Sequence, residues 1–120
     1  MKKQGFSKGA RILKSRDFRH VFLKGKRIQT PHYVIRLYPN GLDQWRLGIS
    51  ISKKVSGVVD RNRTKRILRE IFRTHRMAWG YPRDLMIVVK KLPHHLGLQE
   101  IRQELLQALS QSFPEISPHD

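Results

Sequence analysis

The stretch KKVSGVVDRNRTKRILREIFR, residues 53–73, predicts one helix with two opposed faces. At about 100° per residue, five cations fall within about 60° of Asn62 on one side, namely Lys65, Arg66, Arg69, Arg73 and Arg76. The opposite side carries apolar side chains, namely Ile67, Leu68, Ile71, Phe72 and Trp79. An ordinary surface helix mixes both signs of charge on its polar face, whereas Glu70 is the only acid between Arg61 and Arg76. Because like charges at this spacing repel one another, the face predicts contact with a polyanion that would offset the repulsion.

The positive charge of the chain is concentrated in its first three quarters. The 120 residues carry 25 Lys and Arg against 9 Asp and Glu, a formal net charge of +16. Residues 1–91 hold 24 of these cations and five acids, whereas residues 92–120 hold Arg102 alone against four acids. A field this positive indicates a nucleic acid or an anionic membrane as the partner. The last segment is expected to be structural.

The rest of the composition narrows the possible classes of protein. The longest apolar run, residues 85–89, is far too short to span a bilayer, and the basic start has no apolar core like that of a secretory signal. The chain has no cysteine, which excludes disulfides and Cys-based zinc sites. We therefore expect a cytoplasmic protein with no membrane partner. No nucleophile, paired carboxylate or phosphate loop accompanies the six histidines, so we expect no catalytic residue and no metal site.

One domain is expected for a chain of this length. Residues 1–14 predict a basic arm, residues 15–112 the folded α/β domain and residues 113–120 a flexible tail. Helical spacing and end signals predict a first helix from Ser15 to about Gly25. The basic helix is expected from about residues 58–60 to the Gly-Tyr-Pro stop at 80–82. A final amphipathic helix is predicted over residues 98–109.

Three segments predict strands. Residues 33–38 and 45–52 both alternate between apolar and polar side chains, and the turn cluster 39–43 lies between them. Together they predict an antiparallel hairpin. The continuous apolar run 85–89 predicts a third strand, buried on both faces.

Small side chains on the second predicted strand form a shallow floor, made of Gly48, Ser50 and Ser52 and bordered by Arg36, Tyr38 and Arg46. Grooves for single-stranded RNA combine such cations with aromatic rings on which bases stack, worth about 1–3 kcal/mol per base. The alternative is an ordinary antiparallel face covered by water. Phe18 and Phe22, spaced i,i+4 on the first helix, share the ambiguity, and we expect at least one of them to pack in the core.

These residues resemble a known family. Lys53-Lys54, Arg61-Asn62-Arg63, Lys65-Arg66 and Arg69 are similar to the RNR motif of the protein subunit of bacterial ribonuclease P. Residues 16–22 resemble the first helix of that family, residues 46–54 its central strand and residues 84–89 the strand before its last helix. The resemblance covers roughly residues 7–112, and the RNR segment is its most specific part.

The resemblance implies an α+β fold, a single-domain α-β-β-β-α-β-α sandwich with a mixed sheet. It adds a short strand near residues 27–30 that periodicity does not reveal. It also implies a left-handed βαβ crossover, against the usual right-handed rule. In this family the RNA subunit is the catalyst and uses Mg²⁺ to remove the 5′ leader of precursor tRNA. The implied role is an RNA-binding subunit of an endoribonuclease that binds no cofactor itself.

Two sets of site residues follow from the resemblance and from the residues together. The catalytic RNA is expected to meet phosphate-binding cations and one amide, namely Lys53, Lys54, Arg61, Asn62, Arg63, Lys65, Arg66, Arg69 and Arg73. The leader is expected in a groove lined by Phe18, Phe22, Arg36, Arg46, Ser50 and Ser52. The partners are then the catalytic RNA and precursor tRNA, with the protein a monomer in a one-to-one complex with RNA.

Two other functions compete with this interpretation. A ribosomal or DNA-binding protein would place the basic helix in a groove and prefer duplexes to single strands. A stand-alone nuclease would cleave RNA without an RNA partner.

Overall fold

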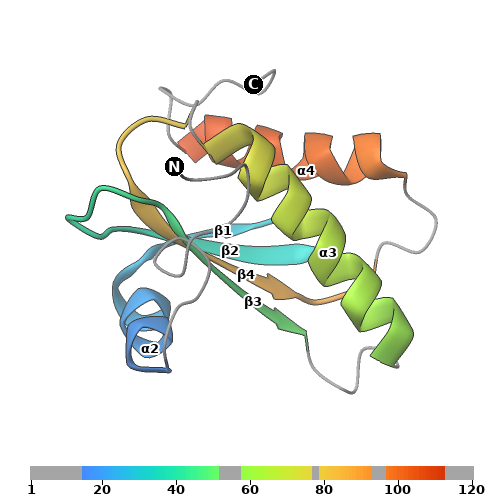
Figure 1. Ribbon diagram of the computed structural model, residues 1–120, viewed down its shortest axis with the longest axis horizontal. Helices are drawn as coiled ribbons and strands as arrows, with labels where there is room; N and C mark the ends of the chain where they lie inside the picture. The colour runs from blue at the N-terminus through green and yellow to red at the C-terminus, as the bar shows by residue number, and fades with distance from the viewer. Residues whose placement is uncertain (1–14, 52–57, 77–78, 93–96, 113–120) are drawn as a thin grey trace, which may run out of the picture.

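The computed structural model describes residues 15–51, 58–76, 79–92 and 97–112, which form an α+β fold (Figure 1). The elements follow one another as α2 (Ser15–Lys24), β1 (Lys26–Gln29), β2 (Tyr33–Pro39), β3 (Arg46–Ile51), α3 (Val58–His75), β4 (Arg83–Val89) and α4 (Leu98–Ser112). The three helices and the three strands predicted from periodicity are confirmed. So is the short extra strand expected from the family resemblance.

The sheet has the strand order β1-β2-β4-β3. β2 pairs antiparallel with β1 and β4, whereas β3 pairs parallel with β4. The predicted hairpin of residues 33–52 is therefore wrong, because β4 lies between its two strands. The reason is burial. Six of the seven residues of β4 are buried, on both faces of the sheet. A strand that is apolar on both faces is favoured at the centre of a sheet, where both of its faces are covered.

The connection from β3 through α3 to β4 is left-handed. Figure 1 shows α3 crossing in front of the sheet, β3 and β4 pointing the same way, and β3 below β4. When the strands are turned to point upward, the chain moves to the left from β3 to β4 through the helix in front. This confirms the expectation from the family resemblance, against a rule that holds in about 98% of such connections.

The two sides of the sheet differ in what covers them. α3 and α4 lie on one side and α2 on the other (Figure 1). The main core fills the α3/α4 side, where Tyr33, Ile35 and Leu37 of β2 are buried with residues of β3, β4 and both helices. On the α2 side, Val21 and Met86 form a smaller buried cluster. This side is less completely covered, and part of it is open.

α3 ends earlier than its pattern predicts. The helix ends at His75, so Trp79 lies beyond it rather than on its apolar face. Trp79 is nevertheless fully buried, and its ring meets Trp45 and Phe72 edge-on. Gly80, with a φ of 88°, makes the turn into β4. Of the helices the structure describes, none is both long enough and apolar enough to cross a membrane.

Candidate nucleic-acid interface

α3 presents its cations to solvent and its apolar residues to the sheet. Asn62, Arg63, Arg66 and Arg69 are exposed, and Arg61 and Lys65 are half-exposed. The opposite side is buried, with Thr64, Leu68, Ile71 and Phe72 all at most 5% exposed. The two-faced helix predicted from the sequence is thus present from residue 58 to residue 75.

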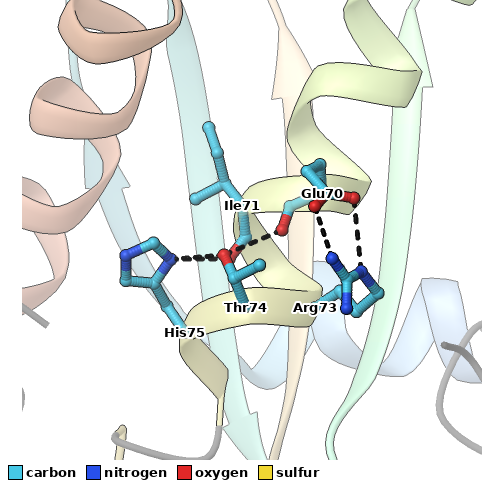
Figure 2. A network of polar contacts seen from close by, with 5 residues as sticks. All are labelled: Glu70, Ile71, Arg73, Thr74 and His75. Atoms are coloured by element: carbon cyan, nitrogen blue, oxygen red, sulfur yellow. Dashed lines mark hydrogen bonds and ion pairs between the residues drawn. The ribbon is translucent and has the colours of Figure 1, made fainter. Parts of the chain in front are cut away.

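One cation of this face is paired within the helix. Arg73 donates two hydrogen bonds to the carboxylate of Glu70, the longer being 3.2 Å from Nε to Oε1 (Figure 2). The hydrogen bonds from Arg73, followed by its positive charge, lower the pKa of Glu70 below its ordinary value. Glu70 therefore stays ionised and neutralises Arg73.

The other cations of the face differ in how they are held. Arg63, Lys65, Arg66 and Arg69 make no ion pair with any residue in the described ranges. Arg76 follows the helix, and its guanidinium lies 5.7 Å from the centre of the Phe72 ring. Burial, followed by repulsion from Arg73, lowers the pKa of Arg76. The strongest positive field is therefore expected near Arg63, Arg66 and Arg69.

The strand register arranges the α2 side of the sheet in rows that cross the strands. One row joins Gln29, Val34, Val88 and Ser50, in the order β1, β2, β4 and β3. None of these four side chains is buried, and Gln29 and Ser50 are exposed. In the next row Met86 and Gly48 are buried on the α2 side. The first row is therefore an open floor beside α2, and we call it the open row.

Two aromatic side chains of α2 stand beside the sheet. Phe18 is half-buried and packs against the cluster of Val21 and Met86. Phe22 is 48% exposed, and the guanidinium of Arg36 lies over its ring at 4.3 Å from the centre. The expectation that at least one of the pair packs in the core is met by Phe18. Phe22 and Arg36 together offer a flat, charged surface next to the open row.

Arg46 is held by a residue from a distant part of the chain. Its guanidinium donates to both oxygens of the buried Asp84 carboxylate, at 2.8 and 2.7 Å, and Asn40 donates to the same group at 2.9 Å. Arg46 lies on the predicted groove face, but this ion pair engages it within the fold. Its role in binding a leader stays a prediction.

Sequence reasoning did not place every residue of this face. Ser52, Lys53 and Lys54 lie outside the described residues, so their predicted roles are not placed by the structure. Conversely, four residues that the register places on the α2 side of the sheet were not predicted to belong to this face, namely Arg27, Gln29, Val34 and Val88. The strand containing Arg27 and Gln29 has a single apolar residue and hence no readable alternation. The other two positions become groove residues only once the register is known. Within the described ranges, no group of three His, Asp or Glu side chains is placed to hold a metal ion.

Comparisons with known proteins show the family to which the chain belongs. The family model described as Ribonuclease P matches residues 6–112. The "Ribonuclease P protein component" of Syntrophus aciditrophicus is 35% identical over 105 residues, covering 88% of each chain. That of Staphylococcus carnosus is 35% identical over 103 residues, covering 85% of this chain and 89% of the relative.

Solved structures show the same fold. The RNase P protein of Staphylococcus aureus has a TM-score of 0.77 at 29% identity, covering 88% of this chain and 96% of that one. The RNase P protein of Thermotoga maritima has a TM-score of 0.76 at 30% identity, covering 84% and 96%. The chain therefore belongs to the family of ribonuclease P proteins, the protein components of a tRNA-processing ribonucleoprotein.

Proposed function

We propose that this chain binds the catalytic RNA of ribonuclease P through α3 and holds the 5′ leader of precursor tRNA on the α2 side of its sheet. The observation that carries the proposal is the two-sided arrangement of the molecule. The exposed cations of α3 lie on the side that carries the main core, and the open row lies on the other side. One protein can therefore contact two RNA segments at once.

The chemistry of each surface suits its proposed ligand. Arg63, Arg66 and Arg69 offer guanidinium groups to phosphates, which position an RNA without reading its sequence. The open row has only uncharged side chains, with Phe22 and Arg36 beside it for stacking. Such a surface suits unstacked bases of a single strand better than a duplex.

The proposed division of labour leaves hydrolysis to the RNA. The Mg²⁺ ions would be held by the RNA partner, and the protein would supply positive charge and hold the leader. Added phosphate neutralisation replaces counterions, so the protein should lower the salt or Mg²⁺ that the RNA requires. We propose a one-to-one complex, in which one α3 face serves one RNA.

Ser50→Trp tests the leader groove directly. Ser50 is exposed at the β3 end of the open row, so a large ring there should block the leader without disturbing packing. The holoenzyme with this variant should lose its preference for precursor over mature tRNA, while the protein's affinity for the catalytic RNA stays near wild type. Both affinities are measured by titration, and a thermal melt verifies folding.

The matched control is Gln107→Trp, which places the same ring at an exposed position on α4. It should behave as wild type in both titrations. If a folded Ser50→Trp variant still discriminates precursor from mature tRNA, the leader does not lie in this groove. If the purified protein cleaves precursor tRNA without RNA, the division of labour is wrong and the nuclease alternative is right.

A further inference from the structure

The α2 side of the sheet carries a pair of arginines directly opposite each other on neighbouring strands. β1 and β2 pair so that Arg27 faces Arg36, while Ile28 faces Ile35 one position further on. Ile28 and Ile35 pack in the main core on the α3/α4 side. Since successive side chains of a strand point to opposite faces, Arg27 and Arg36 both lie on the α2 side.

Among the side chains that the structure describes, no acid forms an ion pair with Arg27 or Arg36. The acid that the register places on the same face is Asp84, and it is already engaged by Arg46 and Asn40. Like charges directly opposite each other on two strands destabilise the pairing. Arg27 is exposed, and the Nε atom of Arg36 is buried with no hydrogen-bond partner among the residues described. An anion bound between the two guanidinium groups would remove the repulsion.

The pair lies close to the surface proposed for the leader. Arg36 stacks on Phe22, beside the open row, and Arg27 continues the same line outward to the β1 edge. The open row crosses four strands, about 14 Å at 4.8 Å per step, from Ser50 at the β3 edge to Gln29 at the β1 edge. Arg27 and Arg36 lie in the next row, two residues along β1 and β2 and about 7 Å from Gln29 and Val34. A phosphate of a strand laid along the open row is therefore within reach of both long side chains.

We propose that Arg27 and Arg36 together bind a single phosphate of the precursor leader, at a subsite where the strand leaves the sheet over β1. This rests on the proposed function, because it extends the leader groove. The proposal places leader nucleotides near the cleavage site towards β3, the opposite edge of the sheet, after which α3 and its cations begin. The subsite over β1 therefore holds a nucleotide farther from that site, and only leaders long enough to cross the sheet reach it.

A simpler role for Arg27 has to be separated from this one. Cations on an edge strand also protect the edge from pairing with other sheets. Lys26 provides the matched control, because it is one residue away on the same strand and its side chain lies on the other face. A general effect of charge would be shared by the two residues, whereas a phosphate subsite belongs to Arg27 alone.

The experiment measures holoenzyme affinity for precursor tRNAs whose leaders are lengthened one nucleotide at a time. The affinity of the wild-type and Lys26→Gln proteins should show a further increase at the leader length that first reaches the subsite. Arg27→Gln should lack that last gain, about two- to fivefold, and should match wild type on shorter leaders. The salt slope of log K for long leaders should fall by about 0.7 in Arg27→Gln. Arg27→Lys should restore part of the gain.

A neutral methylphosphonate at single leader positions then locates the contact. At one position it should weaken wild type and leave Arg27→Gln unaffected. Equal losses of affinity for Arg27→Gln and Lys26→Gln at every leader length would show a general effect of charge and overturn the subsite. An Arg27→Gln variant that keeps the full gain in affinity on long leaders would overturn it as well. If the affinity of the wild-type holoenzyme does not depend on the leader at any length, the proposed function is wrong. Affinities for short leaders show this independently of Arg27.

Discussion

At the scale of single residues, Glu70 reduces the positive charge on the exposed face of α3. Glu70 neutralises Arg73 through two hydrogen bonds, and these hold the pKa of Glu70 below its usual range. The pair therefore persists into mildly acidic solution and is lost only when the pH falls below the ordinary value of a glutamate, about 4.3. Glu70 therefore lowers the positive charge that the proposed RNA-binding face of α3 presents.

Removing that acid should strengthen RNA binding. Glu70→Gln releases Arg73 for phosphate contact, so affinity for the catalytic RNA should rise about two- to fivefold, and the salt slope should steepen by up to about 0.9. Filter binding across a salt series measures both. Asp43→Asn, in the exposed turn before β3, changes net charge equally and should have a smaller effect. Equal gains for the two variants would mean that net charge alone matters.

Tyr33 is a second residue with an unusual environment. It is fully buried at the start of β2, and its hydroxyl has no hydrogen-bond partner within the described residues. Burial, followed by the nearby charge of Glu104, raises the pKa of Tyr33 well above its usual value. The folded state therefore keeps Tyr33 neutral, while the unfolded chain ionises it near pH 10.

The raised pKa sets the direction of a pH effect. Below about pH 10 the ionisation of Tyr33 does not affect the free energy of unfolding. Above that value stability falls as the pH rises, because the unfolded chain loses this proton more readily than the folded protein. Tyr33→Phe should not be less stable than wild type at neutral pH and should gain up to about 1 kcal/mol, because an unpaired buried hydroxyl is removed. Urea denaturation from about pH 8 to about pH 11 should show a flatter profile for Tyr33→Phe. Tyr81→Phe, at an exposed tyrosine, should keep the wild-type profile.

At the scale of elements, a polar clasp joins α4 to the turn between β1 and β2. The carboxylate of Glu104 accepts hydrogen bonds from the Thr30 hydroxyl at 2.6 Å and from the His32 backbone N–H at 2.9 Å. The His32 ring nitrogen Nδ1 lies 2.9 Å from the other oxygen. The side chain of Glu104 is only 13% exposed, so this carboxylate depends on its partners.

Breaking the clasp should destabilise the fold without touching the proposed RNA-binding surfaces. Glu104→Gln replaces one accepting oxygen with a donor, which leaves a partner unsatisfied and should cost about 1–3 kcal/mol. Gln107→Ala, on the exposed side of the same helix, should cost less than about 0.5 kcal/mol. Chemical denaturation measures both. A Glu104→Gln protein as stable as wild type would show that the clasp contributes nothing.

Periodicity predicted the elements of this fold but not their pairing. Alternation in residues 33–38 and 45–52 reports which side chains share a face of one strand, and it says nothing about the neighbouring strand. The position of β4 between β2 and β3 depends on contacts across the sheet. The ion pair of Arg46 with Asp84 joins residues 38 positions apart and has no local signal. The shared face of the α3 cations was predictable, because the periodicity of a single helix determines it without any contact between distant residues.

At the scale of the whole molecule, the positive charge is carried by the elements that precede α4. The formal net charge is +16, and residues 98–112, which form α4, include one cation against two acids. The cations of residues 1–91 repel one another, so the free protein should be only marginally stable at low salt.

An anion that binds the folded surface should therefore stabilise the protein. The expected gain is RT ln(1 + [L]/Kd), about 2.7 kcal/mol at a hundredfold excess over Kd. Sulfate should raise the melting temperature more than chloride at equal ionic strength. Arg66→Ala combined with Arg69→Ala should reduce the difference between the two salts, because two cations of the exposed face are gone. Identical melting temperatures in the two salts would show that no specific anion site exists.

The central position of β4 also determines the order in which the chain can fold. β4 is the last strand in sequence, yet it is the one that joins β2 to β3. As the chain emerges from the ribosome, β1 and β2 can pair early, but β3 has no partner until residues 83–89 have been synthesised. The apolar sides of β3 and α3 stay uncovered during that interval, and such surfaces favour aggregation of unfinished chains. A nascent chain that stops before β4 is therefore expected to need a chaperone, although the finished protein is small.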